Sequence, residues 1–221
     1  MIKRWFVTGT DTEVGKTVAS SALLQAANRA GYRSAGYKPV ASGSEMTAEG
    51  LRNGDALALQ ANSGVALSYD EVNPYVLPNP PRRISSAPMK AGRSTRRGCP
   101  TACAGWNSAP TGCWSRARAG GLPLSAEYTF ADWVQQEQLP VILLVGIKLG
   151  CINHAVLTAQ AVQQAGLTLA GWIANDVAPP GRRHQEWPRC AACCRRRCWA
   201  KSRTCRRLSG RRWGSIWISA C

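Results

Sequence analysis

The sequence predicts an α/β fold with an open, mainly parallel sheet and helices on both of its faces. Short apolar runs alternate along the chain with Ala- and Leu-rich runs of helical length. The run at 140–146 is apolar throughout, which is typical of a parallel strand that is buried on both sides. A loop over residues 9–15, with a glycine at each end, separates the first apolar run from the first helical run.

The first part of the chain predicts, in order, a strand at 5–8, a helix at 18–27, a strand at 32–40, a helix that opens at 55–60 and a proline-rich loop from 73. Gly9 stops the first strand, and Gly31 is placed to end the first helix.

The second part predicts a strand at 140–146, a helix at 152–164 that ends before Gly166, and a strand at 169–174. With 221 residues and 45% hydrophobic composition, the chain 1–221 is large enough for a single domain with a buried core.

Positive charge and cysteine are concentrated in two segments, 82–121 and 188–221. The chain holds 28 Lys and Arg, 12 Asp and Glu and ten Cys, for a net charge of +16. These two segments contain 18 of the basic residues and nine of the cysteines, but neither Asp nor Glu. The remainder is close to neutral, so the charge is not a property of the whole surface, and we expect no nucleic-acid partner.

Signals for export or membrane insertion are missing from the sequence as written. Met1–Arg4 is basic, but no apolar stretch of a signal peptide follows it, and no run approaches the roughly 18 apolar residues of a membrane span. We therefore expect a cytoplasmic protein without a membrane partner.

The loop Gly-Thr-Asp-Thr-Glu-Val-Gly-Lys-Thr at 9–17 is the strongest chemical signal. Between a strand and a helix, such a loop predicts a phosphate site in which backbone N–H groups face the anion. Lys16 would reach the β- and γ-phosphates, and the Thr17 hydroxyl would face Mg²⁺. Five residues instead of the usual four separate Gly9 from Gly15. The alternative is a glycine turn beside a solvated lysine.

The chain resembles the dethiobiotin synthetase family in several motifs that occur in the same order. They are G-T-D-T-E-V-G-K-T at 9–17, G-Y-K-P-V-A-S-G at 36–43, L-R-N-G-D-A at 51–56, F-A-D-W-V at 130–134, K-L-G-C-I-N-H-A at 148–155 and W-I-A-N-D-V at 172–177. The resemblance implies a P-loop α/β ligase of biotin biosynthesis. It also implies that ATP phosphorylates the carbamate formed from 7,8-diaminopelargonic acid and CO₂. The implied cofactor is Mg²⁺, and the implied assembly is a homodimer.

The resemblance also implies roles for individual residues. By similarity, Lys38, Lys16 and Thr12 are catalytic, and Thr12 also binds substrate. The nucleotide site comprises Glu13, Val14, Gly15, Lys16, Thr17, Val18, Asp55, Asn175 and Asp176. Thr17 and Asp55 hold Mg²⁺. The substrate site comprises Ser42 and a second segment that reaches the substrate of the partner subunit: Gly150, Cys151, Ile152 and Asn153.

Several of these residues have a structural alternative. Lys38 and Lys148 could be solvated lysines, Asp55 could be a helix N-cap, and Cys151 could be a small buried residue. The two histidines, His154 and His184, fit surface or helix positions better than metal ligation.

The chain departs from the family where a second Mg²⁺ carboxylate is expected, in an E-G-A-G-G stretch before Pro123-Leu124-Ser125. No acid stands at that place, near Ser115. Back-translated and read one base out of register, residues 112–120 give Val-Leu-Val-Glu-Gly-Ala-Gly-Gly, and the same shift uncovers family-like patterns upstream and near the C-terminus. We therefore interpret 82–121 and 188–221 as frame-shifted translation, from a sequencing error or from a damaged gene whose product is inactive.

Two other functions remain as alternatives. One is a zinc or nucleic-acid module formed by Cys190, Cys193 and Cys194 with the arginines that follow. A second Cys pair or a His pair at zinc-finger spacing is missing from the sequence. A partition-type or metallochaperone-like P-loop ATPase shares the fold, but would lack the features at 38–42 and 150–153.

Overall fold

The computed structural model describes residues 3–78, 111–116, 123–125, 128–176, 198–203 and 217–218. Most of the two segments interpreted as frame-shifted, 82–121 and 188–221, therefore lies outside the described residues. Cys190, Cys193 and Cys194 of the proposed zinc module and His184 also lie outside them.

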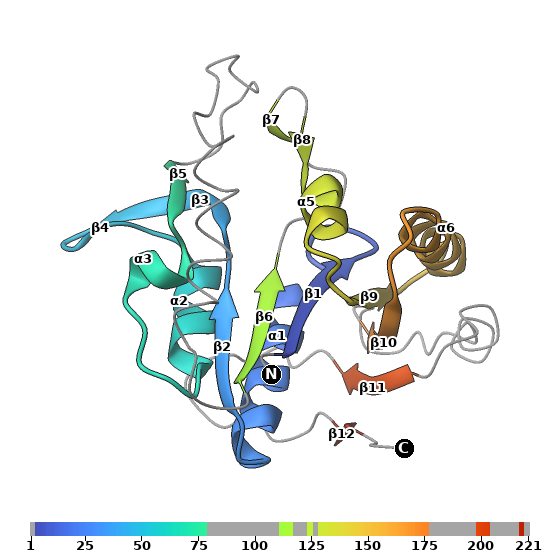
Figure 1. Ribbon diagram of the computed structural model, residues 1–221, viewed down its shortest axis with the longest axis horizontal. Helices are drawn as coiled ribbons and strands as arrows, with labels where there is room; N and C mark the ends of the chain where they lie inside the picture. The colour runs from blue at the N-terminus through green and yellow to red at the C-terminus, as the bar shows by residue number, and fades with distance from the viewer. Residues whose placement is uncertain are drawn as a thin grey trace.

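A seven-stranded sheet forms the centre of the molecule (Figure 1). Its strands are, in spatial order, β12 (Trp217–Ile218), β11 (Cys198–Arg203), β10 (Leu169–Asp176), β9 (Val141–Ile147), β1 (Lys3–Gly9), β6 (Thr111–Arg116) and β2 (Arg33–Tyr37). All neighbouring strands are parallel except β11 and β12. The predicted α/β fold with a mainly parallel sheet is thereby confirmed.

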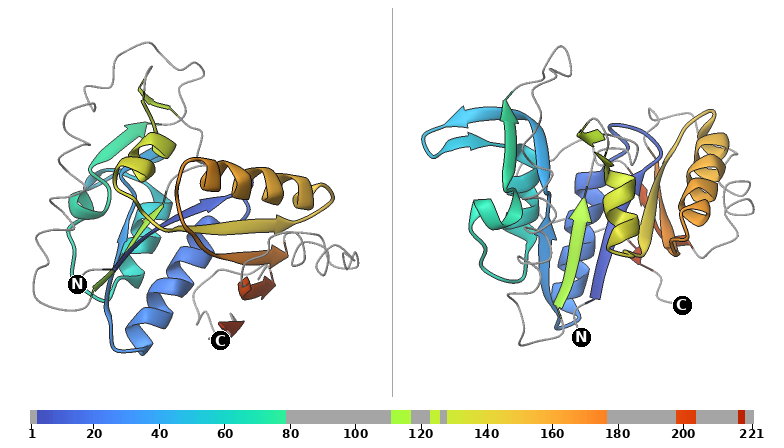
Figure 2. Two further views of the ribbon diagram at one scale, coloured as in Figure 1. Left: turned by 45° about the vertical axis from the view of Figure 1, so that its right-hand side comes forward. Right: turned by 45° about the horizontal axis from the view of Figure 1, so that its top comes forward.

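Helices pack on both faces of this sheet (Figure 2). One face carries α1 (Lys16–Arg29), α2 (Gly54–Asn62) and the short α3 (Tyr69–Val72); the other carries α5 (Phe130–Gln136) and α6 (Cys151–Gln164). Strand β9 shows why both faces are covered: Leu143 and Val145 join the core with α5 and α6, whereas Ile142 and Leu144 join the core with α1 and α2.

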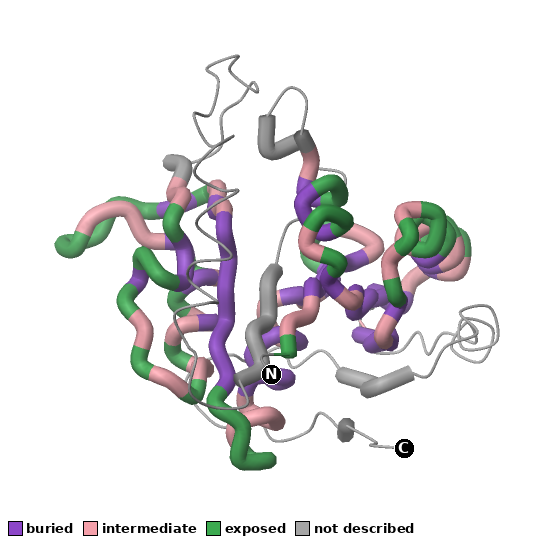
Figure 3. Tube along the Cα trace, viewed as in Figure 1, coloured by how far each residue is buried: buried purple, intermediate pink, exposed green. Residues whose placement is uncertain are grey.

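Buried residues are concentrated along the central strands and the inner sides of the helices (Figure 3). All seven residues of β9 are buried, as its uniformly apolar sequence predicts. Both α1 and α6 begin after a glycine in the left-handed region, Gly15 and Gly150, each with a φ of 86°, and neither helix has a side-chain cap. At the start of α6, the N–H of Cys151 instead donates to the backbone carbonyl of Lys148 at 3.0 Å.

The region predicted as one strand at 32–40 is two strands. Strand β2 ends at Tyr37, and β3 (Val40–Thr47) starts a separate sheet with β4 (Gly50–Arg52) and β5 (Tyr75–Pro78). Pro39 lies at the break, because proline has no N–H to continue the ladder.

The proline-rich loop predicted from residue 73 includes a strand, which is a correction to the sequence prediction. The reason is that β5 lies at the edge of its sheet, where proline is tolerated. A further two-stranded sheet joins β7 (Pro123–Ser125) and β8 (Tyr128–Thr129). Over the described residues, every helix is too short or too polar to cross a bilayer.

Candidate nucleotide and substrate site

The loop between β1 and α1 needs both of its glycines. A Cβ on Gly9 would lie 2.7 Å from Cγ2 of Val14, and a Cβ on Gly15 would lie 2.5 Å from Nδ2 of Asn175. Real side chains do not come this close. Glu13 also adopts a left-handed conformation, with a φ of 57°. The sequence therefore forms a tightly folded loop whose shape is set by close contacts rather than by side-chain caps.

Lys16 is enclosed by this loop rather than solvated. Its side chain is buried, and Nζ donates a hydrogen bond of 2.6 Å to the backbone carbonyl of Asp11. The alternative of a glycine turn with a solvated lysine is therefore wrong. A buried ammonium held beside the uncapped start of α1 concentrates positive potential where an anion would bind.

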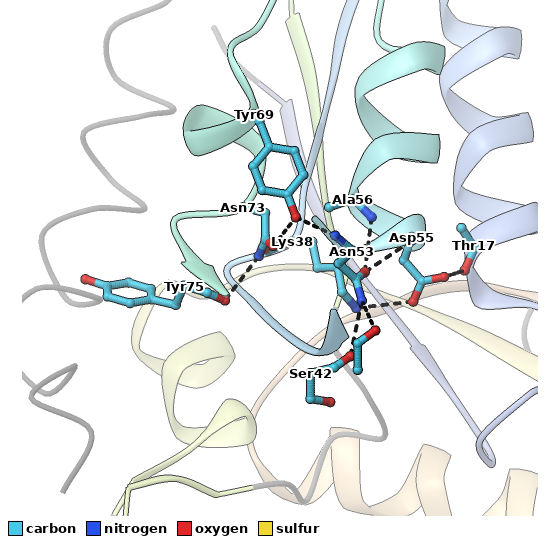
Figure 4. Close-up of polar contacts among 10 residues, drawn as sticks. Thr17, Lys38, Ser42, Asn53, Asp55, Ala56, Tyr69, Asn73 and Tyr75 are labelled. Carbon is cyan, nitrogen blue, oxygen red and sulfur yellow. Dashed lines mark hydrogen bonds and ion pairs between the residues drawn. The ribbon is translucent and has the colours of Figure 1, made fainter. Parts of the chain in front are cut away.

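Three polar side chains meet beside the start of α1 (Figure 4). The Thr17 hydroxyl donates to Oδ1 of Asp55 at 2.5 Å, and Nζ of Lys38 lies 3.4 Å from Oδ2 of the same carboxylate. Lys38 is buried, with 4% of the residue exposed, whereas the Asp55 side chain is 37% exposed. The carboxylate thus bridges a hydroxyl and an ammonium at the mouth of the site.

Asp55 occupies the first turn of α2 and is not its N-cap. The cap is Asn53, whose side-chain oxygen accepts hydrogen bonds from the N–H groups of Asp55 and Ala56. Because Asn53 satisfies the helix terminus, the Asp55 carboxylate is directed towards Thr17 and Lys38. The alternatives of a solvated Lys38 and of a capping Asp55 are both overturned by these contacts.

Asn175 brings the end of β10 to the phosphate loop. Its Nδ2 donates to the Val14 carbonyl at 2.8 Å, whereas its buried Oδ1 has no hydrogen-bond partner within the described residues. Asp176 follows as the last residue of β10 and is half-buried. Asn175 therefore presents an unused acceptor beside the loop.

An ion pair joins the phosphate loop to the segment before α6. Nζ of Lys148 lies 2.6 Å from Oδ2 of Asp11, so Lys148 is not simply solvated. This hydrogen bond, with a second from the Thr12 backbone N–H, lowers the pKa of the Asp11 carboxyl. Both residues were missed as site residues, because neither has a signal in sequence spacing; only the adjacency of β1 and β9 brings them together.

The remaining predicted residues lie around this cluster. Thr12 is exposed in the loop, Val18 is half-buried in α1, and Ser42 is half-buried in β3, where its carbonyl accepts from Asn53. Cys151 is buried, which confirms its structural interpretation, and His154 lies on the exposed face of α6.

The predicted substrate residues come from different parts of the fold: Ser42 lies in β3, and Gly150–Asn153 lies at the start of α6. Gly150–Asn153 opens α6 after β9, whereas Lys38 follows β2, and β1 and β6 stand between those two strands. In the part of the chain that is described, no group of three or more His, Cys, Asp or Glu residues is placed to hold a metal ion.

Residues 5–192 match the CobQ/CobB/MinD/ParA nucleotide binding domain family. Among solved structures, the septum site-determining protein MinD from Pyrococcus horikoshii, complexed with Mg-ADP, is similar at a TM-score of 0.52 and 13% identity. The match covers 91% of this chain and 81% of that one. At this identity the likeness concerns the fold alone.

Much higher identity relates the chain to curated proteins. The ATP-dependent dethiobiotin synthetase of Serratia marcescens is 71% identical over 94% of this chain and 92% of its own length. The enzyme of the same name from Escherichia coli O157:H7 is 63% identical over 85% of this chain and 84% of its own. The Yersinia pestis enzyme is 59% identical over 85% of this chain and 78% of its own length. This set of relatives favours a ligase over a partition-type ATPase.

Proposed function

Because the chain belongs to the family of ATP-dependent dethiobiotin synthetases, we propose that it converts 7,8-diaminopelargonic acid, CO₂ and ATP into dethiobiotin, ADP and phosphate. The observation that carries this proposal is the meeting of Lys38, Asp55 and Thr17 beside the loop that encloses Lys16. A partition-type ATPase would need the loop but not the buried lysine at the end of β2.

The proposed reaction proceeds in three steps. One amine of the substrate adds to CO₂ and loses a proton, giving a carbamate. A carbamate oxygen then attacks the γ-phosphorus of ATP, and ADP leaves. The second amine attacks the carbonyl carbon of the resulting mixed anhydride, the C–O bond to phosphate breaks, and the ureido ring closes.

These steps need charge neutralisation more than a strong base, because an anionic carbamate must approach an anionic phosphate. Two buried ammonium groups suit this need. Lys16 lies within the phosphate loop, where it would contact the β- and γ-phosphates. Lys38 is joined to Thr17 through Asp55 and would contact both the carbamate and the γ-phosphate. The exposed Thr12 would bind the substrate from the loop side.

The oxygen donors present fit a magnesium ion. The Thr17 hydroxyl and the Asp55 carboxylate are already in contact, and Mg²⁺ in phosphate sites is commonly held by one or two protein oxygens together with the phosphates themselves. When bound, the ion would neutralise charge on the phosphates. Thr17 and Asp55 would hold the ion, and Lys38 contacts the same carboxylate at 3.4 Å.

The adenine end of the site would lie beside β10. The unused Oδ1 of Asn175 is an acceptor of the kind that the exocyclic amino group of adenine requires, while its Nδ2 is engaged by Val14. Asp176 follows it on the same strand end, and Glu13 to Val18 would surround the phosphates.

The substrate would be held by two segments. Ser42 is close in sequence to Lys38, at the start of β3. The start of α6, residues Gly150 to Asn153, has no side-chain cap and suits a carboxylate. In the family this segment serves the partner's substrate, and its distance along the sheet from β2 supports that arrangement here. The proposed enzyme is therefore a homodimer.

The test is product formation by the purified chain with ATP, Mg²⁺, bicarbonate and the diamine. We expect dethiobiotin and ADP in equal amounts, and a loss of about a hundredfold or more in rate for Lys38→Met. Lys3→Met, at an exposed position outside the site, is the matched control and keeps full activity. ATP turnover that proceeds equally well without the diamine would instead indicate an ATPase and contradict the proposal.

A further inference from the structure

A polar network lies between the end of β2 and the start of α2, beside the proposed catalytic groups (Figure 4). It begins at the backbone of Lys38. The N–H of Lys38 donates to the Val72 carbonyl at 2.8 Å, and its carbonyl accepts from Nδ2 of Asn73 at 2.6 Å. Asn73 is fully buried. The main chain that carries the catalytic ammonium is thus fixed on both sides by residues 72 and 73.

The hydroxyl of Tyr69 connects Asn73 to the start of α2. It donates to Oδ1 of Asn73 at 3.0 Å and accepts from the backbone N–H of Asn53 at 2.7 Å. Asn53 in turn caps the helix turn that carries Asp55. One phenolic oxygen therefore stands between the segment that fixes Lys38 and the segment that fixes Asp55.

Asn53 extends the same network to the predicted substrate residue Ser42. Its Nδ2 donates to the carbonyls of Ser42 and Gly43, at 3.1 and 3.4 Å. The guanidinium of Arg52 lies over the face of the Tyr69 ring, 4.3 Å from its centre, and packs against it. The three segments around the site consequently share one connected set of buried and partly buried hydrogen bonds.

Tyrosine is suited to this place because its hydroxyl donates and accepts at the same time. Without the hydroxyl, a buried N–H of Asn53 and a buried oxygen of Asn73 would both lose their partner. Buried groups of this kind relax towards new partners rather than stay unsatisfied. The Lys38 and Asp55 segments would then be free to shift relative to each other.

We propose that Tyr69 is a positioning residue, whose hydroxyl holds the Lys38 ammonium and the Asp55 carboxylate in a fixed relative placement for phosphoryl transfer. The proposal rests on the function proposed above, but it concerns residues that touch neither nucleotide nor substrate. It differs from a general stabilising role, because it predicts damage confined to the Lys38–Asp55 side of the site. The loop around Lys16 and Asn175, which would hold the nucleotide itself, has its own contacts.

The experiment compares Tyr69→Phe with Tyr75→Phe, the same chemical change six residues along the chain. Among the described residues, Tyr75 contacts this part of the chain through its backbone: its carbonyl accepts from Asn73, and its N–H donates to the Pro39 carbonyl. Its ring points away from the cluster in Figure 4. ADP affinity without metal, Mg²⁺ affinity of the ADP-bound protein, and kcat and KM for ATP are measured for each, with circular dichroism and thermal unfolding as checks of folding.

For Tyr69→Phe we expect an unchanged affinity for metal-free ADP, a roughly tenfold weaker affinity for Mg²⁺, and a kcat lower by about ten- to a hundredfold at a KM for ATP within twofold of the parent. Tyr75→Phe should match the parent throughout. Unchanged Mg²⁺ affinity and kcat in a folded Tyr69→Phe protein overturn the proposal. A loss of metal-free ADP affinity as large as the loss of Mg²⁺ affinity also overturns it, because that result would indicate a purely structural role.

A second variant decides the question if Tyr69→Phe does not fold. Asn73→Asp keeps the acceptor for the Tyr69 hydroxyl, but donates to the Lys38 carbonyl only when its carboxyl is protonated. The Mg²⁺ affinity of this variant, divided by that of the parent at the same pH, should rise as the pH falls. If this ratio does not change with pH, the proposal is rejected. If the parent chain makes no dethiobiotin, the proposed function fails, while the Mg²⁺ titration still tests the role of Tyr69.

Discussion

The ammonium nitrogen of Lys148 lies 2.6 Å from a carboxylate oxygen of Asp11. The two residues are 137 positions apart, and their contact holds the loop before α6 against the loop after β1. Asp11 also gives its backbone carbonyl to the buried ammonium of Lys16. The placement of Lys16 therefore depends partly on a residue from the second half of the chain.

Removing this partner should change the titration of Asp11. In Lys148→Met, we expect the pKa of the Asp11 carboxyl to rise towards its ordinary value of 3.8, because the hydrogen bond from Lys148 is the largest cause of its lowering. The Thr12 N–H remains and keeps part of the effect. NMR titration of the carboxyl carbon from about pH 2 to 6 measures the change.

The sign for stability follows from the same shift. A carboxyl whose pKa is lowered by folding stabilises the protein above its ordinary pKa, and this stabilisation is lost as the pH falls through the lowered value. Lys148→Met should flatten that dependence, with a small amplitude because the pair is about 40% exposed. Lys3→Met serves as the control, and an Asp11 pKa that stays equally low in Lys148→Met contradicts the prediction.

Gly15→Ala tests the close approach of the phosphate loop to β10. Gly15 and Gly31 both have a left-handed φ, of 86° and 82°, but only at Gly15 does a Cβ meet another atom, Nδ2 of Asn175 at 2.5 Å. Gly31→Ala is thus a matched control for backbone strain, at about 1–2 kcal/mol. Gly15→Ala should cost about 1–3 kcal/mol more, because a side chain is forced into a packed site.

Urea unfolding measures both costs, and ADP titration measures the site itself. We expect ADP affinity to fall by about tenfold or more in Gly15→Ala and to stay unchanged in Gly31→Ala. Equal unfolding free energies and ADP affinities for the two variants would show that the contact with Asn175 imposes no constraint.

The frame-shift interpretation makes a prediction about the DNA. Strand β6 lies between β1 and β2, with Arg116 in register with the fully buried Val7. A strand between two covered neighbours favours an apolar run such as β9, and the shifted frame supplies Val-Leu-Val followed by Glu. We expect resequencing of the DNA for residues 80–125 and 185–221 to recover that frame.

The protein encoded by the restored frame should then form dethiobiotin at least about tenfold faster than the chain as written, because it regains the carboxylate that the family resemblance assigns to Mg²⁺. A DNA sequence that agrees with the chain as written would end the sequencing-error explanation, and equal rates for the two proteins would contradict the importance of the missing acid.

The proposed homodimer predicts a mass in solution of twice the 23.8 kDa of one chain. Leu149, directly before Gly150, is 86% exposed in the single chain, which is unusual for so large an apolar side chain beside a proposed binding segment. Leu149→Asp should shift the mass measured by light scattering towards one chain. Leu157→Asp, at a less exposed leucine further along α6, is the comparison; a single-chain mass for the parent refutes the dimer.

The sequence predicted the parts of the fold that depend on local patterns. The uniformly apolar run of β9, the glycine-bounded loop and the helices α1 and α6 all follow from residue order, because each pattern is read within about 15 residues. It did not predict that β2 and β3 belong to different sheets. That division depends on Lys38-Pro39 and on pairing with β5, more than 30 positions away.

The predicted site was incomplete in a similar way. Lys16, Lys38, Thr17 and Asp55 were found because they stand in motifs with a chemical meaning. Asp11, Lys148 and Tyr69 were not, because they act through partners that lie elsewhere in the chain. Tyr69 in particular is sixteen positions from Asn53, and a tyrosine at the start of a four-residue helix has no pattern that marks it as buried.

The contact between Asn175 and Val14 has a consequence for how the protein is made. The phosphate loop is synthesised within the first 17 residues, yet the amide that closes it belongs to β10, 161 positions later. Strand β10 pairs with β9, which pairs with β1, so the contact requires three strands to have assembled in register. A nascent chain on the ribosome must therefore emerge past β10 before this contact can form, and a nucleotide that binds the closed loop would favour the nearly finished fold.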